Sequence, residues 1–495
     1  MHYSLAKLRD IIYPSKSCKL VQPNLLSAQI QLTHKTISMS TIDRRNFLIN
    51  SAAAGIGIST LGMPHSRAAQ PNKKLRVLSI GVIGTIGADD RRAVAKHPDA
   101  EIVGLCDVDA LSLAEAAKEH PAAFTCRDYR EAFSKHRDQF DAVIVSVPDH
   151  SHAPIILTAM KHDKHVYGQK PLVQQLEELV MIEQALAAKP QLVTQLGNQR
   201  MASPHRRAAV DILRQKQLGK VIKAYAWTGS PSADGPYFNY EKVINPDTNP
   251  PDHLDWNLWL GPCQEMPYRE LIAPVKWRSY WDFGTNGLGD WGCHILDVIF
   301  LAYNELQSPI SVLAECPEPA GKVFHVNPCK TTVTYKVSSD FFANDTFPLH
   351  YYDTNQQPLP EEMGIPEPVG DSNIVVLVCE GGTLTLGAEG PLKIWRDGKV
   401  EQGLRMPGLP KQYEPLNHWH AWVDNCLGKK TELLTPFKDA VRITEAALLA
   451  VKATRFPGQT LLWDKSKLEF TNHAEATNTI VRRQYREGFA PPKVI

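Results

Sequence analysis

The stretch from Leu75 to Asp107 constrains the fold of this chain more than any other part of the sequence. An apolar run of strand length, Leu75–Ile80, leads into Gly81-Val82-Ile83-Gly84-Thr85-Ile86-Gly87. A helical pattern from about Asp89 to His97 follows, and then a second strand, Glu101–Cys106, which ends at Asp107. The order strand, glycine turn, helix, strand and acid is typical of a dinucleotide-binding βαβ unit.

Each part of this order has a physical role in holding a dinucleotide. Glycines let the backbone approach a pyrophosphate, the helix N-terminus offers N–H groups to it, and the acid accepts hydrogen bonds from a ribose diol. The turn is irregular, because Val82 stands where the usual spacing has a glycine. An acid at position 107 favours NAD over NADP, since a 2′-phosphate there would meet a negative charge. We therefore predict cofactor contacts from Gly81, Gly84, Thr85, Ile86, Gly87 and Asp107.

The alternation of strands and helices continues up to about residue 197. A β-branched run over Asp141–Val147 is typical of a parallel strand buried on both faces, and a short strand ends at Gly168-Gln169-Lys170-Pro171. The pattern also predicts helices over Ala153–His162 and Leu176–Ala188, and a strand over Gln191–Leu196. Because ligands bind at the carboxyl ends of such strands, we expect further cofactor contacts from Pro148, His150, His152, Gln169, Lys170 and Asn198.

The pattern changes after about residue 200 and predicts a second domain. Strand-like segments at Ala224–Thr228, Thr331–Val337 and Ile374–Cys379 no longer alternate with helices, and helical periodicity returns at Trp419–Cys426 and Phe437–Arg455. We predict an α/β fold with an N-terminal Rossmann domain over residues 69–197. Residues 198–495 would form an α+β domain with a large, mainly antiparallel sheet, used for substrate binding and self-association.

The N-terminal region carries an export signal. Thr41-Ile42-Asp43-Arg44-Arg45-Asn46-Phe47-Leu48 is a twin-arginine motif, and a small, apolar run and Ser66-Arg67-Ala68 follow it. We predict a signal peptide over residues 39–68, translation from Met39 rather than through a leader over 1–38, and a periplasmic or secreted protein. The apolar run is too short for a lasting membrane anchor; an uncleaved amphipathic anchor is the alternative.

Composition narrows the class of protein further. With 495 residues, 43% of them hydrophobic, and a net charge of +1, the chain suits a globular protein and argues against a nucleic-acid partner. The nine cysteines include no C-x-x-C pair, so no disulfide framework is indicated.

A second group of reactive side chains lies at Asp290 and His294. On a helix these residues share one face, so the carboxylate could orient the imidazole or stabilise its protonated form. Oxidation of an alcohol needs a hydride acceptor and a proton acceptor; NAD would be the first, and His294 or Lys170 the second. A structural ion pair and a solvated lysine are the alternatives. Two ligands without a third nearby do not indicate a metal.

These motifs together resemble the Gfo/Idh/MocA family of oxidoreductases. The resemblance rests on the glycine turn, Asp107, the Pro148–His152 loop and Gln169-Lys170-Pro171. Trp256–Pro262, Lys276-Trp277-Arg278, Gly289-Asp290-x-x-x-His294 and the residues from Trp463 to Arg486 resemble the exported bacterial branch of that family.

The resemblance implies an NAD(P)-dependent enzyme that acts on sugars, cyclitols or their derivatives. Lys170 would polarise the reacting hydroxyl, Asp290 and His294 would form the acid/base pair, and His150 and His152 would lie beside the nicotinamide. Our candidates for the sugar pocket are Lys276, Arg278, Tyr280 and Trp281, with core packing as the alternative for the two aromatic residues. The family usually has Glu before the motif lysine where this chain has Gln169, and we expect Gln169→Glu to be tolerated.

Export constrains the chemistry further. An exported enzyme has no free NAD pool to draw on, so it should bind its cofactor tightly and return it to its starting redox state in each cycle. A sugar oxidoreductase with two coupled substrates meets this requirement. So does an NAD-dependent glycosidase that oxidises C3 transiently and expels the aglycone by elimination. A carbohydrate-binding protein without turnover is a third hypothesis.

Overall fold

The computed structural model describes residues 74–84, 86–229, 244–317, 321–325, 329–353, 356–369, 373–388, 390–401, 413 and 416–494. Thr85, the leader and the predicted signal peptide lie outside these ranges, so their assignments stay predictions. Within the same ranges, no helix combines the length and the apolar character that crossing a membrane requires.

The first sheet is six-stranded and parallel, in the order β3-β2-β1-β4-β5-β6. This is the Rossmann order, whose two halves diverge between β1 and β4. The Ala-Val-Ile-Val sequence of β4 is buried at every residue, as expected for a parallel strand covered on both faces. The strands are β1 Leu75–Ile80, β2 Ala100–Cys106, β3 Phe124–Cys126, β4 Ala142–Val145, β5 His165–Gly168 and β6 Thr194–Leu196.

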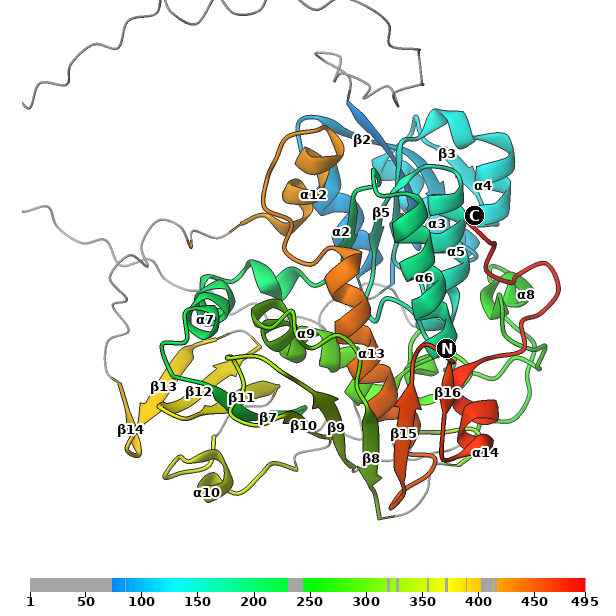
Figure 1. Ribbon diagram of the computed structural model, residues 1–495. Helices are drawn as coiled ribbons and strands as arrows, with labels where there is room; N and C mark the ends of the chain where they lie inside the picture. The colour runs from blue at the N-terminus through cyan, green and yellow to red at the C-terminus, as the bar shows by residue number, and fades with distance from the viewer. Residues whose placement is uncertain are drawn as a thin grey trace, which may run out of the picture. The chain divides into compact units, whose positions relative to one another are not determined.

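Helices connect these strands and cover the sheet (Figure 1). Asp109 and Asp128 accept backbone N–H hydrogen bonds at the starts of α3 and α4, which stabilises those helix ends. The helices are α2 Gly87–Ala95, α3 Ala110–Glu119, α4 Tyr129–Lys135, α5 His152–Lys161 and α6 Leu176–Ala188.

The second sheet has ten strands in the order β14-β13-β12-β11-β7-β10-β9-β8-β15-β16. Every neighbouring pair is antiparallel except β7 with β10, so the sheet is mainly antiparallel, as predicted. The strands are β7 Val221–Trp227, β8 Ser311–Glu315, β9 Lys330–Lys336, β10 Thr346–Tyr352, β11 Ile374–Cys379, β12 Gly382–Gly387, β13 Leu392–Arg396, β14 Lys399–Val400, β15 Thr460–Asp464 and β16 Glu469–Phe470.

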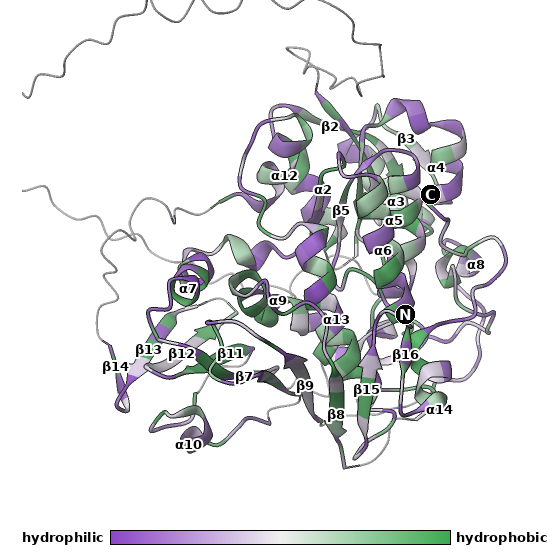
Figure 2. Ribbon diagram, in the orientation of Figure 1, coloured by the Kyte–Doolittle hydropathy of each residue, from purple (hydrophilic) through white to green (hydrophobic). Residues whose placement is uncertain are grey.

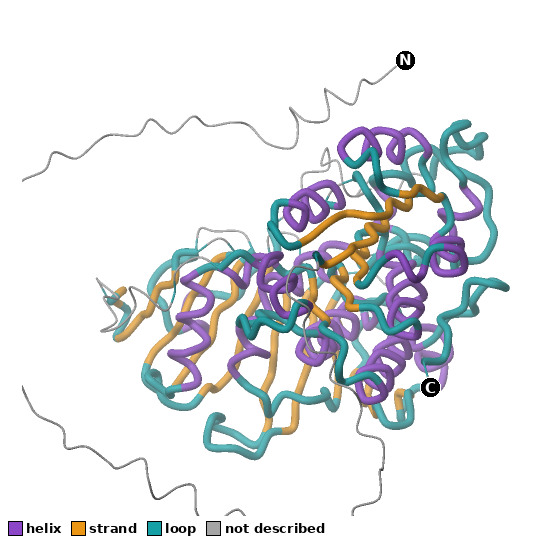
Figure 3. Tube along the Cα trace, turned by 90° about the horizontal axis from the view of Figure 1, so that it is seen from above, coloured by secondary structure: helices purple, strands orange, loops and turns teal. Residues whose placement is uncertain are grey.

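Three helices pack on one face of this sheet: α7 Pro204–Arg214, α9 Asn286–Ala302 and α13 Phe437–Ala453 (Figures 1 and 3). Helix α9 is hydrophobic along most of its length, and α13 contacts α6 and β6 of the first sheet as well as α9, β8 and β9 of the second (Figure 2). The two sheets therefore share one continuous core. Shorter helices are α8 Trp256–Leu260, α10 Pro360–Met363 and α14 Ala474–Ala476.

One helix from the C-terminal part of the chain completes the Rossmann domain. Helix α12, His418–Cys426, packs against α2. Its Trp422 and Val423 are fully buried in the same apolar cluster as Val77 of β1 and Ile144 of β4. The Rossmann core is thus formed by residues on both sides of the predicted boundary at 197/198.

The sequence did not indicate a disulfide, but the structure contains one. Cys316 follows β8 and Cys329 precedes β9, and their sulfur atoms are bonded. Sheet pairing brings the two positions together, whereas cysteine spacing alone does not define connectivity.

Candidate active site

The glycine turn after β1 adopts the backbone that its sequence suggests. Gly81 and Gly84 have φ angles of +80° and +65°, which side chains rarely allow. A Cβ at Gly81 would lie 2.2 Å from the Ser146 carbonyl oxygen, and one at Gly87 would lie 2.3 Å from that of Gly81. A Cβ at Gly84 would meet no atom within 4 Å, so the Gly84 backbone faces open space at the start of α2. Ile86 is the residue that caps this helix.

Asp107 ends β2 beside that turn. Its carboxylate accepts hydrogen bonds from the backbone N–H groups of Val82, at 2.9 Å, and Asp109, at 3.0 Å. These bonds explain why Val82 is accepted in the turn, since its amide anchors the acid while its side chain enters the core. Burial raises the pKa of Asp107 to about 6.

Both histidines of the Pro148–His152 loop are fully buried, and their place beside the nicotinamide stays a prediction. The His150 Nε2 atom lies 2.8 Å from the Trp259 carbonyl oxygen. The two ring nitrogens of His152 lie 2.7 and 2.8 Å from the carbonyl oxygens of Pro171 and Val147. Burial lowers the pKa of His150 to about 3 and that of His152 to about 4. These rings join the loop to its neighbours, and the loop can reach a cofactor through its backbone.

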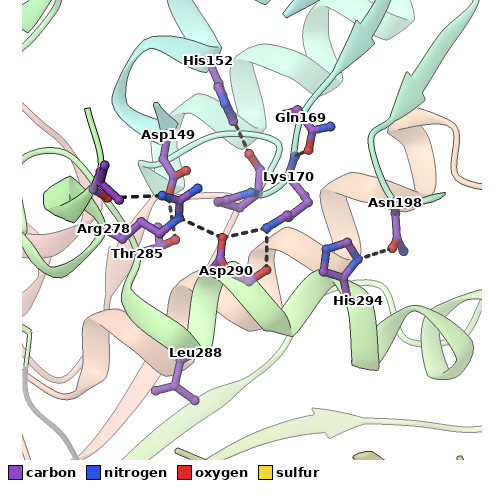
Figure 4. Close-up of polar contacts among 12 residues, drawn as sticks. Asp149, His152, Gln169, Lys170, Asn198, Arg278, Thr285, Leu288, Asp290 and His294 are labelled. Atoms are coloured by element: carbon purple, nitrogen blue, oxygen red, sulfur yellow. Dashed lines mark hydrogen bonds and ion pairs between the residues drawn. The ribbon is translucent and has the colours of Figure 1, made fainter. Parts of the chain in front are cut away.

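Lys170 and Asp290 meet across the two domains (Figure 4). The Lys170 ammonium donates to the Asp290 carboxylate at 2.7 Å and to its carbonyl oxygen at 3.1 Å. The Arg278 Nε atom donates to the same carboxylate oxygen at 3.3 Å. Burial would raise the pKa of Asp290, but the two cations hold it below the ordinary value. Asp290 therefore serves as the counter-ion of Lys170 and Arg278, and not as the orienting partner of His294.

His294 is oriented instead by Asn198, whose Oδ1 atom lies 2.7 Å from His294 Nδ1. The Asn198 Nδ2 atom donates to the Asp297 carboxylate at 2.8 Å, and Arg206 forms a fully buried ion pair with that carboxylate. An ionised carboxylate cannot donate, so the amide must present its oxygen to His294. The proton of a neutral His294 then lies on Nδ1, and Nε2 carries the lone pair.

Burial and the nearby Lys170 lower the pKa of His294 well below its ordinary value, so the ring is neutral. The side chain of Asn198 is fully buried. The Asn198 side chain thus orients the histidine, and its contact with the cofactor stays a prediction.

A buried carboxyl group that the sequence analysis did not assign also lies here. Asp149, 4% exposed, accepts a hydrogen bond from the Thr285 hydroxyl at 2.7 Å, at the start of α9. Burial raises the pKa of Asp149 to about 7. The sequence places Asp149 in the Pro148–His152 loop, where cofactor contacts were expected. Only the tertiary structure shows that it lies near Arg278 and Asp290 (Figure 4).

Of the four predicted sugar-pocket residues, Arg278 contacts the Lys170–Asp290 pair. Tyr280 is 5% exposed and packs against Phe324 in a separate core cluster, which corrects its assignment. Trp281 is half-buried and lies against His325, with 3.7 Å between the ring centroids and the ring planes tilted by 48°, and its indole N–H is donated to the Gly321 carbonyl. Lys276 is half-buried on the segment that carries Arg278.

Two family models match this chain. Residues 75–196 match the oxidoreductase family with an NAD-binding Rossmann fold, and residues 236–338 match the C-terminal alpha/beta domain of the same family. The chain belongs to the Gfo/Idh/MocA oxidoreductase family. The resemblance to this family is confirmed, as is the Rossmann fold with NAD as its cofactor, whereas membership of the exported branch stays a prediction.

Individual members of the family are more distant. An inositol 2-dehydrogenase from Rubrobacter xylanophilus is 24% identical over 210 residues, covering 41% of this chain and 59% of that relative. A glycosyl hydrolase family 109 protein from Shewanella pealeana is 28% identical over 160 residues, covering 28% of this chain and 35% of that relative. A crystal structure of an inositol dehydrogenase homologue from Azotobacter vinelandii, complexed with NADH and myo-inositol, has a TM-score of 0.54 at 14% identity. That likeness covers 79% of this chain and 98% of the other.

The residues of this family member fit NAD. The open backbone at Gly84 and the N-terminus of α2 would hold the pyrophosphate, and Asp107 has carboxylate lone pairs to spare for a ribose diol. Lys170, Asp290 and His294 lie at the same carboxyl edge of the sheet, where the nicotinamide of a dinucleotide is expected.

Proposed function

We propose that this protein is an NAD-dependent oxidoreductase that transfers a hydride between the cofactor and a hydroxyl-bearing carbon of a sugar, cyclitol or derivative. The proposal depends on two side chains at the site. The Lys170 ammonium is held by the Asp290 carboxylate, and His294 is neutral with the lone pair on its Nε2 atom. These are a cation and a base, the two groups that alcohol oxidation requires from a protein.

Each side chain has one task in this proposal. The His294 Nε2 atom takes the proton of the substrate hydroxyl, and the Lys170 ammonium stabilises the negative charge that develops on the oxygen. Asp290, to which Arg278 also donates, holds Lys170 in place, and Asn198 keeps the His294 proton on Nδ1. Bound NAD supplies the hydride acceptor.

A polyhydroxylated ring is the substrate class that the site and the relatives support best. Arg278 and Lys276 offer charged donors to hydroxyl groups, and the family includes inositol dehydrogenases.

Export by the twin-arginine route remains part of the proposal. The Cys316–Cys329 disulfide supports it, because structural disulfides persist in oxidising compartments and are rare in the cytosol of most organisms. An enzyme exported in the folded state would carry its NAD with it and recycle it between two substrates.

Redox-assisted glycoside cleavage is the second candidate. The matches to glycosyl hydrolase family 109 proteins favour it, and the same Lys170 and His294 would serve the oxidation at C3. A non-catalytic carbohydrate-binding protein is a weaker proposal, because a binder does not need a base with a fixed tautomer beside a paired ammonium.

One experiment separates these functions. The exported protein is purified, its NAD content is measured, and panels of cyclitols, free sugars and aryl glycosides are added while bound NADH absorbance and aglycone release are followed. Reduction of bound NAD that a second sugar reverses would support the oxidoreductase. Aglycone release without net NADH would support the glycosidase, and the absence of both signals would contradict both enzymatic proposals.

We further propose that the protein self-associates through the face of the ten-stranded sheet opposite α7, α9 and α13. Alternate residues of β9 are half-exposed, and Leu462 of β15 is 45% exposed. Light scattering should give a multiple of the chain mass, and Leu462→Lys should shift it towards the monomer.

A further inference from the structure

Gln169, which precedes the lysine at the site, has a buried acidic partner. Its side-chain amide donates to the Asp90 carboxylate at 2.7 Å, and the two residues are 3% and 0% exposed. The amide oxygen in turn lies 3.3 Å from the backbone N–H of Lys170. One amide thus links a buried acid to the backbone of the proposed catalytic lysine.

Asp90 joins four elements around the cofactor site. It lies in the first turns of α2, whose N-terminus would hold the pyrophosphate. Its Oδ2 atom also accepts from the Ser146 hydroxyl at the end of β4, at 2.7 Å, and its Oδ1 atom accepts from the Trp419 indole of α12, at 2.8 Å. The three side chains that donate to Asp90, those of Gln169, Ser146 and Trp419, are all neutral.

The Gln169 amide packs closely against the chain at Gly197, which follows β6. A Cβ at Gly197 would lie 2.5 Å from the Gln169 nitrogen and 2.8 Å from its oxygen, so the amide lies directly on the β6 backbone end. A glutamate at 169 would place a second carboxylate within hydrogen-bond distance of Asp90. One of the two would then have to hold a proton or move.

We propose that Asp90 is a positioning residue that, through the amide of Gln169, sets the backbone from which Lys170 reaches the substrate. A glutamine at position 169 is then the required partner of an acid at position 90. The proposal rests on the proposed function for the role of Lys170, but the Asp90–Gln169 linkage itself does not. It also leads to the opposite prediction for Gln169→Glu, which was expected from the sequence to be tolerated.

A reciprocal exchange tests this linkage. Gln169→Glu should lower kcat by about 10²-fold with little change in the substrate KM, because a small displacement of a catalytic group costs this much. The double variant D90N/Q169E again has one amide and one carboxylate. The amide is now at position 90 and donates to the carboxylate at position 169, so the direction of the hydrogen bond is reversed. It should recover kcat to within about twofold of the unmodified protein, since the coupled pair is complete again.

Two further variants control for folding and for burial of a charge. Gln169→Met removes the amide without adding charge, so it should fold and still lose kcat. Gln195→Glu adds a carboxylate at a fully buried glutamine that donates to the His418 carbonyl, and Asp90→Asn should not rescue it. Unchanged kcat in Gln169→Met or Gln169→Glu, or a double variant no better than Gln169→Glu alone, would overturn the proposal.

The same variants separate this proposal from the proposed function. If no tested sugar is turned over, NAD affinity and the thermal midpoint are measured instead, because Asp90 also belongs to the helix that would bind the pyrophosphate. A loss of NAD affinity of about tenfold in Gln169→Glu that D90N/Q169E reverses would support the linkage. Losses that simply add in the double variant would overturn it.

Discussion

At the residue scale, the site depends on hydrogen-bond polarity more than on any single unusual side chain. Asp297 is acceptor-only, so the Asn198 amide turns its oxygen to His294, and the histidine proton lies on Nδ1. Asp90 is also acceptor-only, so Gln169 turns its nitrogen to Asp90. Each proposed catalytic residue is thus linked to a buried carboxylate by a neutral amide. Asn198 links His294 to Asp297, and Gln169 links the Lys170 backbone to Asp90.

Replacing Lys170 by methionine should lower kcat by about 10³-fold, because the developing charge on the substrate oxygen loses its cation. NAD affinity should change far less than kcat, whereas the thermal midpoint should fall, because Asp290 keeps only Arg278 as a counter-ion. Steady-state kinetics checks this result against Lys161→Met, which removes an exposed lysine from α5. A Lys170→Met enzyme with normal turnover would refute the assignment.

Asn198→Ala should lower kcat about 10- to 100-fold with a nearly unchanged substrate KM, because His294 loses the acceptor that keeps its proton on Nδ1. Nitrogen-15 NMR of the histidine ring should show a mixture of tautomers in the variant. Asn425→Ala serves as the control. It removes an amide of α12 that donates to the carbonyl oxygens of Ala421 and Thr431. A single unchanged tautomer in Asn198→Ala would contradict the account.

Asp149 should make the protein less stable as pH rises from about 4 to about 7. Its pKa is raised from 3.8 to about 7 in the folded state, so the folded protein keeps a proton that the unfolded chain releases. The stabilisation is complete below the unfolded pKa and is lost as pH rises through the folded pKa, at no more than about 1.4 kcal/mol per pH unit. Urea unfolding across this range should give a smaller slope for Asp149→Asn, and an equal slope would contradict the assignment.

At the element scale, local sequence patterns predicted the Rossmann strands and helices well, because each pattern depends on neighbours in the chain. The strand Leu75–Ile80 and the helix Leu176–Ala188 have the predicted bounds, and Lys170 is in contact with Asp290. The partners of these residues could not be predicted in the same way. Asp90 and Gln169 are 79 residues apart, and Asn198 and His294 are 96 apart, so only the tertiary structure pairs them. The packing of α12 in the Rossmann domain could not be predicted either, because α12 is far from that domain in the sequence.

A fragment of residues 69–197 should fail to fold and to bind NAD. It lacks Trp422 and Val423, which cover Val77 and Ile144, and it lacks the Trp419 donor to Asp90. Exposing this much apolar surface costs about 25 cal/mol for each Å². Circular dichroism and NAD titration check this outcome, with residues 69–494 as the control; a folded, NAD-binding fragment would contradict it.

At the scale of the whole molecule, one helix connects the cofactor half to the substrate half. Helix α13 packs on α6 and β6 of the Rossmann sheet and on α9 of the second domain, and α9 carries Asp290 and His294. The distance from Lys170 to its partners is therefore set by a shared core and not by a hinge between separate domains.

Breaking the disulfide by Cys316→Ser and Cys329→Ser together should lower the free energy of unfolding by about 3 kcal/mol, as expected for a loop of this size. Turnover at a temperature where both forms are folded should be unchanged, because neither cysteine contacts the site residues. Denaturant unfolding with and without reductant tests this, and equal stability of the two forms would show that the bond does not contribute.

The central claim, that Lys170 and His294 serve hydride transfer to NAD, is tested most directly by following the hydride itself. Sugars and cyclitols carrying deuterium on their carbinol carbons are incubated with the purified protein, and the bound nucleotide is analysed by mass spectrometry. We predict that deuterium appears in the nucleotide with the unmodified protein and is nearly absent with Lys170→Met, although both bind NAD. Nucleotide that stays free of deuterium while the unmodified protein converts its substrate would contradict the claim.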